Sequence, residues 1–213
     1  MTQPPETFLL RHAARLDHPI DLSSFEEIGR GRTRAVFWSE SRPEIVVKVG
    51  IKPGYLPRLI WRETRGRSNL GGPVPKMHGY THVAGRLAQV CQSVLGMDGR
   101  PALTLSDHHI GKGIDEACLA QMNDLVEDLL RHRVPVRELK AANVALGRAG
   151  GQGPVRLWLI DGVGERALLP VRRFLPFAET LHTLRRAPEL CKSMPNVDWD
   201  ARSRSYVRRK VTD

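Results

Sequence analysis

Apolar positions gather in short runs through the first half of the chain, and turn residues separate the runs. Short runs rich in β-branched and aromatic residues predict β-strands. Five runs fit this pattern: residues 25–28, 35–38, 45–49, 77–83 and 86–92. An Ala84-Gly85 turn marks the last two as a hairpin, and Pro57 opens a helix that runs through Glu63. The first half is therefore predicted to be a five-stranded sheet with one helix, and the fold class to be α+β.

The second half changes to a helical period. Apolar residues share one helical face up to His132, at Leu119, Met122, Val126, Leu129 and Leu130. Short strands are predicted at residues 134–136, 144–146 and 155–160, followed by a helix over 177–184 and a basic tail. At the opposite end, Leu9, Leu10, Ala13 and Leu16 have helical spacing and predict a short helix on the body of the protein.

Length and composition favour one compact unit, because 213 residues with 41% hydrophobic content can bury one sizeable core or two small lobes. We find neither an apolar run of about 20 residues, as a transmembrane helix requires, nor a signal peptide, which predicts a cytoplasmic location. The three cysteines are far apart without metal-site spacing, so we expect reduced, buried thiols.

A net charge of +10 indicates phosphate-bearing partners such as nucleotides, nucleic acid or lipid surfaces. The basic tail carries Arg202, Arg204, Arg208, Arg209 and Lys210 with Trp199 and Tyr206 between them. Three interpretations stay open for it. We favour a solvated, fraying terminus; the alternatives are nucleic-acid binding by phosphate contacts and stacking, and contact with an anionic membrane surface.

Two features of the first half are typical of phosphate binding. Gly29 and Gly31 form part of a GxGxxG pattern between two strands, a context that favours a phosphate-covering hairpin over a dinucleotide fold, although a simple Gly-rich turn is the more frequent source of such a pattern. Arg34 stands in place of a third glycine, where its side chain either lies over the phosphates or projects into solvent. Lys48 lies in a β-branched strand, where it either faces solvent or is held toward phosphates by a carboxylate. Glu63 is the best-placed partner, with Glu44 as the alternative.

A second group of polar residues has the order of a phosphoryl-transfer site. Glu138 is placed to orient an acceptor hydroxyl, Lys140 to neutralise the γ-phosphate, and Asn143 to bind a metal ion. Asp161 ends an apolar run and precedes Gly162, as expected of a residue that binds Mg²⁺. Each of these residues also fits an ordinary polar turn, but the complete order favours a catalytic site.

These motifs together resemble the protein-kinase-like fold, over about residues 25–165. The short chain, the Gly29-x-Gly31-x-x-Arg34 loop and the Asp98-Gly99 turn are most similar to the YrbL family, small bacterial kinase-like proteins of the PhoP regulatory network. The resemblance implies a five-stranded antiparallel lobe over residues 1–93 with an amino-terminal extension, and a reduced, mostly helical lobe over 94–213 with a basic tail. It further implies ATP and Mg²⁺ between the lobes, with Val90 and Gln92 near the adenine.

Three departures from the kinase pattern bear on activity. Glu138 stands where protein kinases have Asp, Val136 replaces a His, and the segment after Asp161 is short for a peptide-binding lobe. An extra methylene shifts the carboxylate by roughly 1.5 Å, and misplacements of about 1 Å can cost on the order of 10²-fold in rate. We treat Ala187-Pro188-Glu189, which spells a kinase motif, as a coincidence.

The leading hypothesis is thus an ATP-dependent kinase that phosphorylates a hydroxyl of a small molecule, a sugar or a lipid-linked acceptor. The alternative is a nucleotide-binding pseudokinase that acts as a regulatory interaction module. A nucleic-acid-binding protein is the third hypothesis. His78 and His82 lie four apart in a predicted strand and lack helical ligand geometry, so we expect structural or surface histidines there and not a zinc site.

Overall fold

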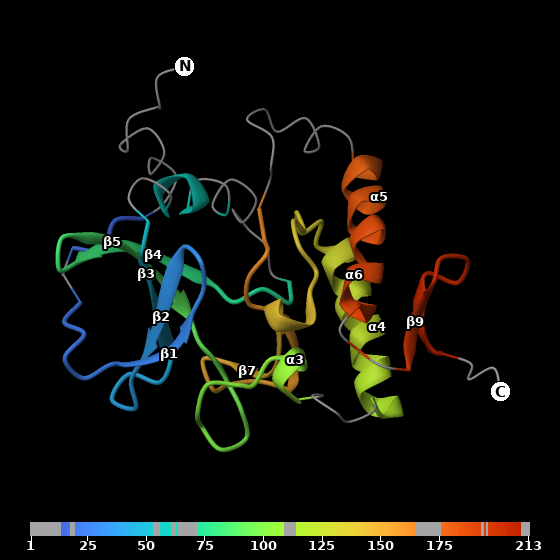
Figure 1. The fold of residues 1–213 in the computed structure, drawn as a ribbon, viewed down its shortest axis with the longest axis horizontal. Coiled ribbons are helices and arrows are strands. Elements are labelled where there is room, and N and C mark those ends of the chain that lie inside the picture. The colour runs from blue at the N-terminus through green and yellow to red at the C-terminus, as the bar shows by residue number, and fades with distance from the viewer. Residues whose placement is uncertain are drawn as a thin grey trace.

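The computed structural model describes residues 14–17, 20–52, 56–60, 63, 72–108, 114–164, 176–192, 194 and 196–209. Figure 1 shows two parts side by side, a β-sheet formed by the first half of the chain and a mixed region of helices and short strands formed by the second. The connection between them passes through β6, Val94–Leu95.

The sheet has five antiparallel strands in the order β1-β2-β3-β5-β4. They are β1 Glu26–Arg30, β2 Arg34–Trp38, β3 Ile45–Gly50, β4 Met77–Val83 and β5 Arg86–Gln92. The prediction of a five-stranded antiparallel sheet is therefore confirmed, and β4 and β5 begin and end where the sequence predicted.

The two faces of this sheet serve different purposes. Ile45, Val47 and Val49 of β3 pack with Ala88 and Val90 of β5 in one hydrophobic cluster. The alternate positions, including Val46 and Lys48, face the opposite side and line a cavity. The two-residue period of a strand enforces this division, so each residue's place in the strand decides whether it supports the core or the cavity.

Residues 56–60 and 63 are helical, as predicted, and Glu63 is buried. We call this segment the Glu63 helix. Leu56, Leu59 and Ile60 pack against Leu87 of β5, which fixes the helix against the sheet.

The short amino-terminal helix was predicted from four residues, of which Leu9, Leu10 and Ala13 lie outside the described residues. The prediction is wrong for Leu16, because residues 14–16 run extended along β4: Leu16 N donates to Tyr80 O at 2.9 Å, and Tyr80 N donates to Ala14 O at 2.9 Å. A Cβ at Gly79 would lie 2.3 Å from Ala14 O, so glycine permits this close approach.

The second half is built around α4, Glu116–Arg131, whose apolar face matches the predicted helix. Asp115 caps its amino terminus by accepting from Cys118 N at 2.7 Å. Around it lie α3 Leu105–His108, η1 Ala141–Asn143, β7 Val144–Ala149, β8 Arg156–Leu159, α5 Pro176–Arg186 and α6 Pro188–Cys191. Strands β6, β7 and β8 form a small antiparallel sheet. Among its described residues, the second half thus combines helices with short strands and is less helical than predicted.

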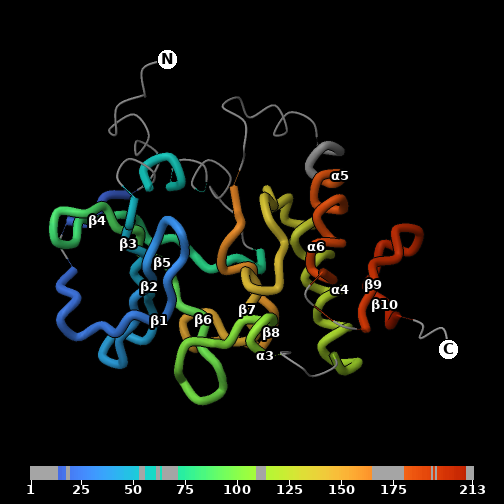
Figure 2. Tube along the Cα trace, viewed as in Figure 1, coloured from blue at the N-terminus to red at the C-terminus, as the bar shows by residue number. Residues whose placement is uncertain are grey.

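The basic tail is folded as far as Arg209, which corrects the prediction of a fraying terminus for these residues, and Lys210 lies outside the described residues. β9 Val197–Asp200 and β10 Ser205–Arg208 form an antiparallel hairpin beside α4, as both Figure 1 and Figure 2 show. Tyr206 is buried in the main core, and its hydroxyl donates to Ala187 O at 3.0 Å. Asn123 of α4 accepts from Tyr206 N at 2.6 Å. The alternating Val197 and Trp199 were the signal for β9, but the many arginines obscured it.

Candidate functional site

Two adjoining cavities lie between the sheet and the second half. One, of about 590 Å³, is mainly apolar and is lined by Val36, Val46, Cys91, Val94, Ala145 and Ile160, among other residues. The other, of about 600 Å³, is polar and is lined by Gly31, Arg32, Thr33, Arg34, Val36, Lys48, Arg137, Glu138, Asn143 and Asp161. Both include Val36, Lys48, Asn143 and Asp161. We call them the apolar cavity and the polar cavity.

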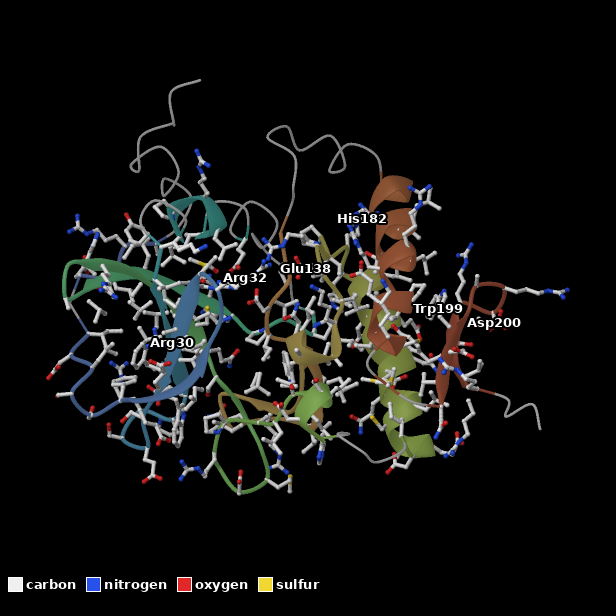
Figure 3. All side chains as sticks on the ribbon, in the orientation of Figure 1. Arg30, Arg32, Glu138, His182, Trp199 and Asp200 are labelled. Carbon is white, nitrogen blue, oxygen red and sulfur yellow. The ribbon has the colours of Figure 1, made fainter. Side chains whose placement is uncertain are left out.

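The β1–β2 hairpin forms one wall of both cavities. Gly29 lines the apolar cavity at an irregularity in the β1–β2 register, and Gly31 lines the polar one. Gly31 N donates to Arg34 O at 2.8 Å, which closes the turn between the strands. In Figure 3, Arg32 on this hairpin and Glu138 on the second half lie near each other, at the polar cavity that both residues line.

The predicted pairing of Lys48 with Glu63 is wrong. Arg34 Nη1 donates to Glu63 Oε1 at 3.1 Å, while Lys48 Nζ donates to the backbone oxygen of Ile160 at 2.8 Å. Gln89, opposite Lys48 in the β3–β5 register, also bonds Glu63 through Nε2 at 2.6 Å. The sheet order explains the outcome. Arg34 and Gln89 reach the buried carboxylate from β2 and β5, the strands on either side of β3, and Lys48 of β3 bonds the segment that precedes Asp161.

Arg34 also joins the sheet to the second half, because its Nη2 donates to Asp161 Oδ2 at 2.6 Å. Burial lowers the pKa of Arg34, but the charges of Glu63 and Asp161 outweigh burial and leave that pKa raised. Burial likewise raises the pKa of Asp161. The charges of Arg34 and Lys48 and the hydrogen bonds from Arg34 and Gly162 outweigh this effect, so the pKa of Asp161 lies well below its ordinary value. Asp161 is therefore an ionised carboxylate at neutral pH.

The segment that carries Glu138 is held by the segment after Asp161. Arg137 N and Glu138 N both donate to Gly162 O, at 2.7 and 3.1 Å, and Leu139 anchors the segment in the core. Gly162 has a φ of +81°, and a Cβ there would lie 2.2 Å from Glu138 O. Glycine is thus required for these two segments to meet. The predicted strand at 134–136 is reduced to a bridge between Val136 and Val163.

Glu138 and Asn143 face the polar cavity, and Lys140 lies beside them at the surface. Lys140 Nζ donates to Glu138 Oε2 at 3.1 Å. Burial raises the pKa of Glu138, yet the hydrogen bond and charge of Lys140, with the charge of Arg137, hold that pKa below its usual range. Glu138 is therefore an anion that can accept a hydrogen bond from a hydroxyl.

The segment expected to contact a base lies along the apolar cavity, with a shift of one residue. Gln92 lines this cavity, whereas Val90 belongs to the hydrophobic cluster on the opposite face of the sheet. Cys91 lines the cavity in its place. The sequence analysis did not predict Cys91 as a lining residue. Residues two apart on a strand share a face, so Cys91 lies on the same face as Gln89, which stands opposite Lys48.

The donor set at Asp161 fits a magnesium ion. Asp161 supplies a carboxylate and Asn143 an amide, and both line the polar cavity. Mg²⁺ is commonly held by one or two protein oxygens, with substrate phosphates and water completing its coordination. In the described part of the chain, no cluster of three or more His, Cys, Asp or Glu side chains forms a protein-only metal site. His78 and His82 lie on β4, as expected.

The family model described as "PhoP regulatory network protein YrbL" matches residues 20–195, most of the chain. The chain belongs to the YrbL family. Its three-dimensional fold matches the crystal structure of the PknI kinase domain of Mycobacterium tuberculosis, with a TM-score of 0.50 and 15% identity over 84% of this chain and 78% of that one.

A double mutant of the same PknI domain matches equally well, with a TM-score of 0.50 and 15% identity over 83% of this chain and 76% of that one. This YrbL protein thus has a kinase-like fold. A search of curated protein sequences found no match. Among the described residues, no helix is long and apolar enough to cross a membrane.

Proposed function

We propose that this YrbL protein is an ATP-dependent phosphotransferase that phosphorylates a hydroxyl group of a small molecule, a sugar or a lipid-linked acceptor. One observation carries the proposal: Lys48, Glu138, Asn143 and Asp161, which are far apart in the sequence, all line one polar cavity beside an apolar one. An apolar cavity suits a nucleobase, and a neighbouring cavity with basic groups suits its phosphates. The kinase-like fold supports the same assignment.

The roles of the residues follow from their places around the cavities. The hairpin with Gly29 and Gly31 covers the phosphates, and Arg34 and Lys48 supply positive charge. Gln92 and Val90 belong to the strand beside the base, Gln92 at the cavity and Val90 behind it. Asn143 and Asp161 would hold Mg²⁺, which when bound neutralises part of the triphosphate charge.

Glu138 carries the chemical step in this proposal. Its carboxylate accepts a hydrogen bond from the acceptor hydroxyl and orients the oxygen toward the γ-phosphorus of ATP. A bond forms between that oxygen and the phosphorus, the bond from the phosphorus to the bridging oxygen of ADP breaks, and the proton passes to Glu138. Lys140, hydrogen-bonded to Glu138, keeps the carboxylate ionised before transfer and supports the γ-phosphate.

The acceptor is proposed to be small because the polar cavity, at about 600 Å³, must also accommodate phosphates. A sugar or a lipid headgroup satisfies this limit more readily than a folded protein. The exposed arginines of the β9–β10 turn, Arg202 and Arg204, are available for contact with an anionic surface, which would suit a lipid-linked acceptor.

Substitution of Asp161 with asparagine tests the proposal. Asp161→Asn keeps the size of the side chain but removes its charge, so Mg-ATP turnover should fall by about 10²-fold or more. The thermal unfolding profile should still show one cooperative transition. Asp198→Asn, which removes a carboxylate paired with Arg209 on the surface, is the matched control and should turn over ATP like the unmodified protein. Unchanged turnover in Asp161→Asn would contradict the metal-binding role.

A second candidate function is a pseudokinase that binds nucleotide and acts as a regulatory interaction module. It is favoured by the longer side chain of Glu138, which bonds Lys140 in the structure. Glu138→Asp discriminates between the two functions. An increase in ATP turnover with this substitution indicates catalysis that the longer side chain weakens. Nucleotide binding without turnover in either form supports the regulatory module.

Nucleic-acid binding through the tail, the third hypothesis, loses support from the structure. Tyr206 is buried and cannot stack on a base, while Arg208 pairs with Glu116 and Arg209 with Asp198. Removing the chain beyond residue 195 would also delete Val197 and Tyr206 from the core, so truncation would not test this hypothesis.

A further inference from the structure

Arg34 is the most deeply buried cation around the polar cavity, since the residue is 6% exposed and Lys48 is 8% exposed. Its partner Glu63 is also buried. It donates to Glu63 Oε1 and Gln89 Oε1, each at 3.1 Å, and to Asp161 Oδ2 at 2.6 Å. It therefore bonds the sheet, the Glu63 helix and the second half at one point.

We propose that Arg34, and not Lys48, is the cation that Glu63 holds against the phosphates of bound ATP, and that Lys48 positions Asp161. This inference rests on the proposed function. The contacts of the two cations differ in kind. Arg34 bonds two carboxylates directly, whereas Lys48 donates to the backbone oxygen of Ile160, the residue before Asp161, at 2.8 Å.

Arg34 retains the capacity to bind a phosphate. A guanidinium has five N–H donors, and hydrogen bonds to described residues use Nη1 twice and Nη2 once. Donors at Nε and Nη2 therefore remain for a ligand, and Arg34 lines the polar cavity. Planar guanidinium donors suit phosphate oxygens better than a single ammonium does.

The surroundings of Glu63 explain why an arginine takes this place. Gln89 donates to Glu63 Oε2 at 2.6 Å and accepts from Arg34 at 3.1 Å, so its amide fixes both partners. Gln89 stands directly opposite Lys48 on the neighbouring strand. The carboxylate is thus already bonded by Gln89 and Arg34, and the ammonium of Lys48 is directed to Ile160.

Charge balance in this cluster also favours a role with ligands. A buried ion pair is weak evidence for stability, because removing charges from water costs free energy that the pairing seldom exceeds. Arg34 is buried, bonds two carboxylates and lines the polar cavity. The side chain of Asp161 is 37% exposed and bonds Arg34 through a single oxygen. An incoming triphosphate can therefore share the positive charge of Arg34 with Asp161.

Calorimetric titration of Mg-ATP into the chain of residues 1–213 and its variants tests the inference. Arg34→Gln should weaken ATP binding by about tenfold or more, the equivalent of one charge-assisted hydrogen bond. Adding Glu63→Gln to Arg34→Gln should cost little more, because the two residues act as a pair. The effects of Glu63→Gln and Lys48→Gln on the free energy of ATP binding should instead add when the two substitutions are combined. Arg131→Gln, which removes a surface arginine with two carboxylate partners, is the control and should bind like the unmodified protein.

Two charge-conserving variants, together with the neutral Lys48→Gln, separate positioning from binding and serve where Arg34→Gln does not fold. Arg34→Lys should weaken ATP binding more than Lys48→Arg does, while Lys48→Gln should lower kcat more than it raises KM for ATP. The inference is overturned if the effects of the Lys48 and Glu63 substitutions on ATP binding are coupled while the Arg34 variants bind ATP like the unmodified protein. An unmodified chain that binds no ATP would instead overturn the proposed function, and the inference with it.

Discussion

At the scale of single residues, two cations set the charge of Asp161. Arg34 bonds both Asp161 and Glu63, and the charge of Lys48 also lowers the pKa of Asp161. The lowered pKa of Asp161 means that its pairing stabilises the fold at pH values above its unfolded pKa of about 4. This contribution is lost only as the pH falls toward the lower pKa of the folded state. Asp161 therefore stays ionised at neutral pH.

The buried phenol of Tyr206 predicts that the stability of the fold depends on pH in the alkaline range. Burial raises the pKa of Tyr206 well above 10. Above about pH 10 the unfolded chain loses the phenolic proton first, so stability should fall as the pH rises. Burial also raises the pKa values of Cys118 and Cys191 to about 11, which adds to this decline.

Tyr206→Phe isolates the contribution of the hydroxyl. The substitution should cost about 1 kcal/mol at neutral pH, because it removes the hydrogen bond to Ala187 O. The free energy of unfolding, measured by denaturant titration between pH 7 and 11, should then decline less steeply than in the unmodified protein. Equal slopes in the two proteins would show that Tyr206 does not titrate with unfolding.

At the scale of elements, short apolar runs and turn residues predicted most of the sheet. The limits of β4 and β5 follow from the Ala84-Gly85 turn, and α4 follows from its apolar stripe. The hairpin β9–β10 was missed, because its inward-facing residues Val197, Trp199 and Tyr206 share a short segment with several exposed arginines. Its stability comes from contacts with α4 and Ala187, which local sequence does not reveal.

In the site too, some features could be predicted from the sequence and others depend on how the strands pair. Sequence order indicated that Glu138, Asn143 and Asp161 belong together, and the structure brings them to one cavity. Sequence did not reveal which cation bonds Glu63, because that depends on the register of β2, β3 and β5. A shift of one residue likewise exchanges Val90 for Cys91 at the apolar cavity.

At the scale of the whole molecule, the cavities lie where the sheet meets the second half. Arg34 and Lys48 each cross this boundary, Arg34 to Asp161 and Lys48 to Ile160. A nucleotide bound there would contact both parts and stabilise their arrangement. Residues 1–213 are accordingly proposed to form one kinase-like domain, whose parts separate cooperatively on unfolding.

The central claim is a nucleotide site between the two parts, and thermal unfolding of residues 1–213 with ATP, with and without Mg²⁺, tests it most directly. A ligand that binds only the folded state raises the free energy of unfolding by about 2.7 kcal/mol at a concentration one hundred times its Kd. For a chain of this size, that corresponds to an increase in Tm of roughly 5–10 °C. We expect such an increase with Mg-ATP and a smaller one with ATP and a chelator. No change in Tm at millimolar ATP in either condition would contradict a nucleotide site between the two parts.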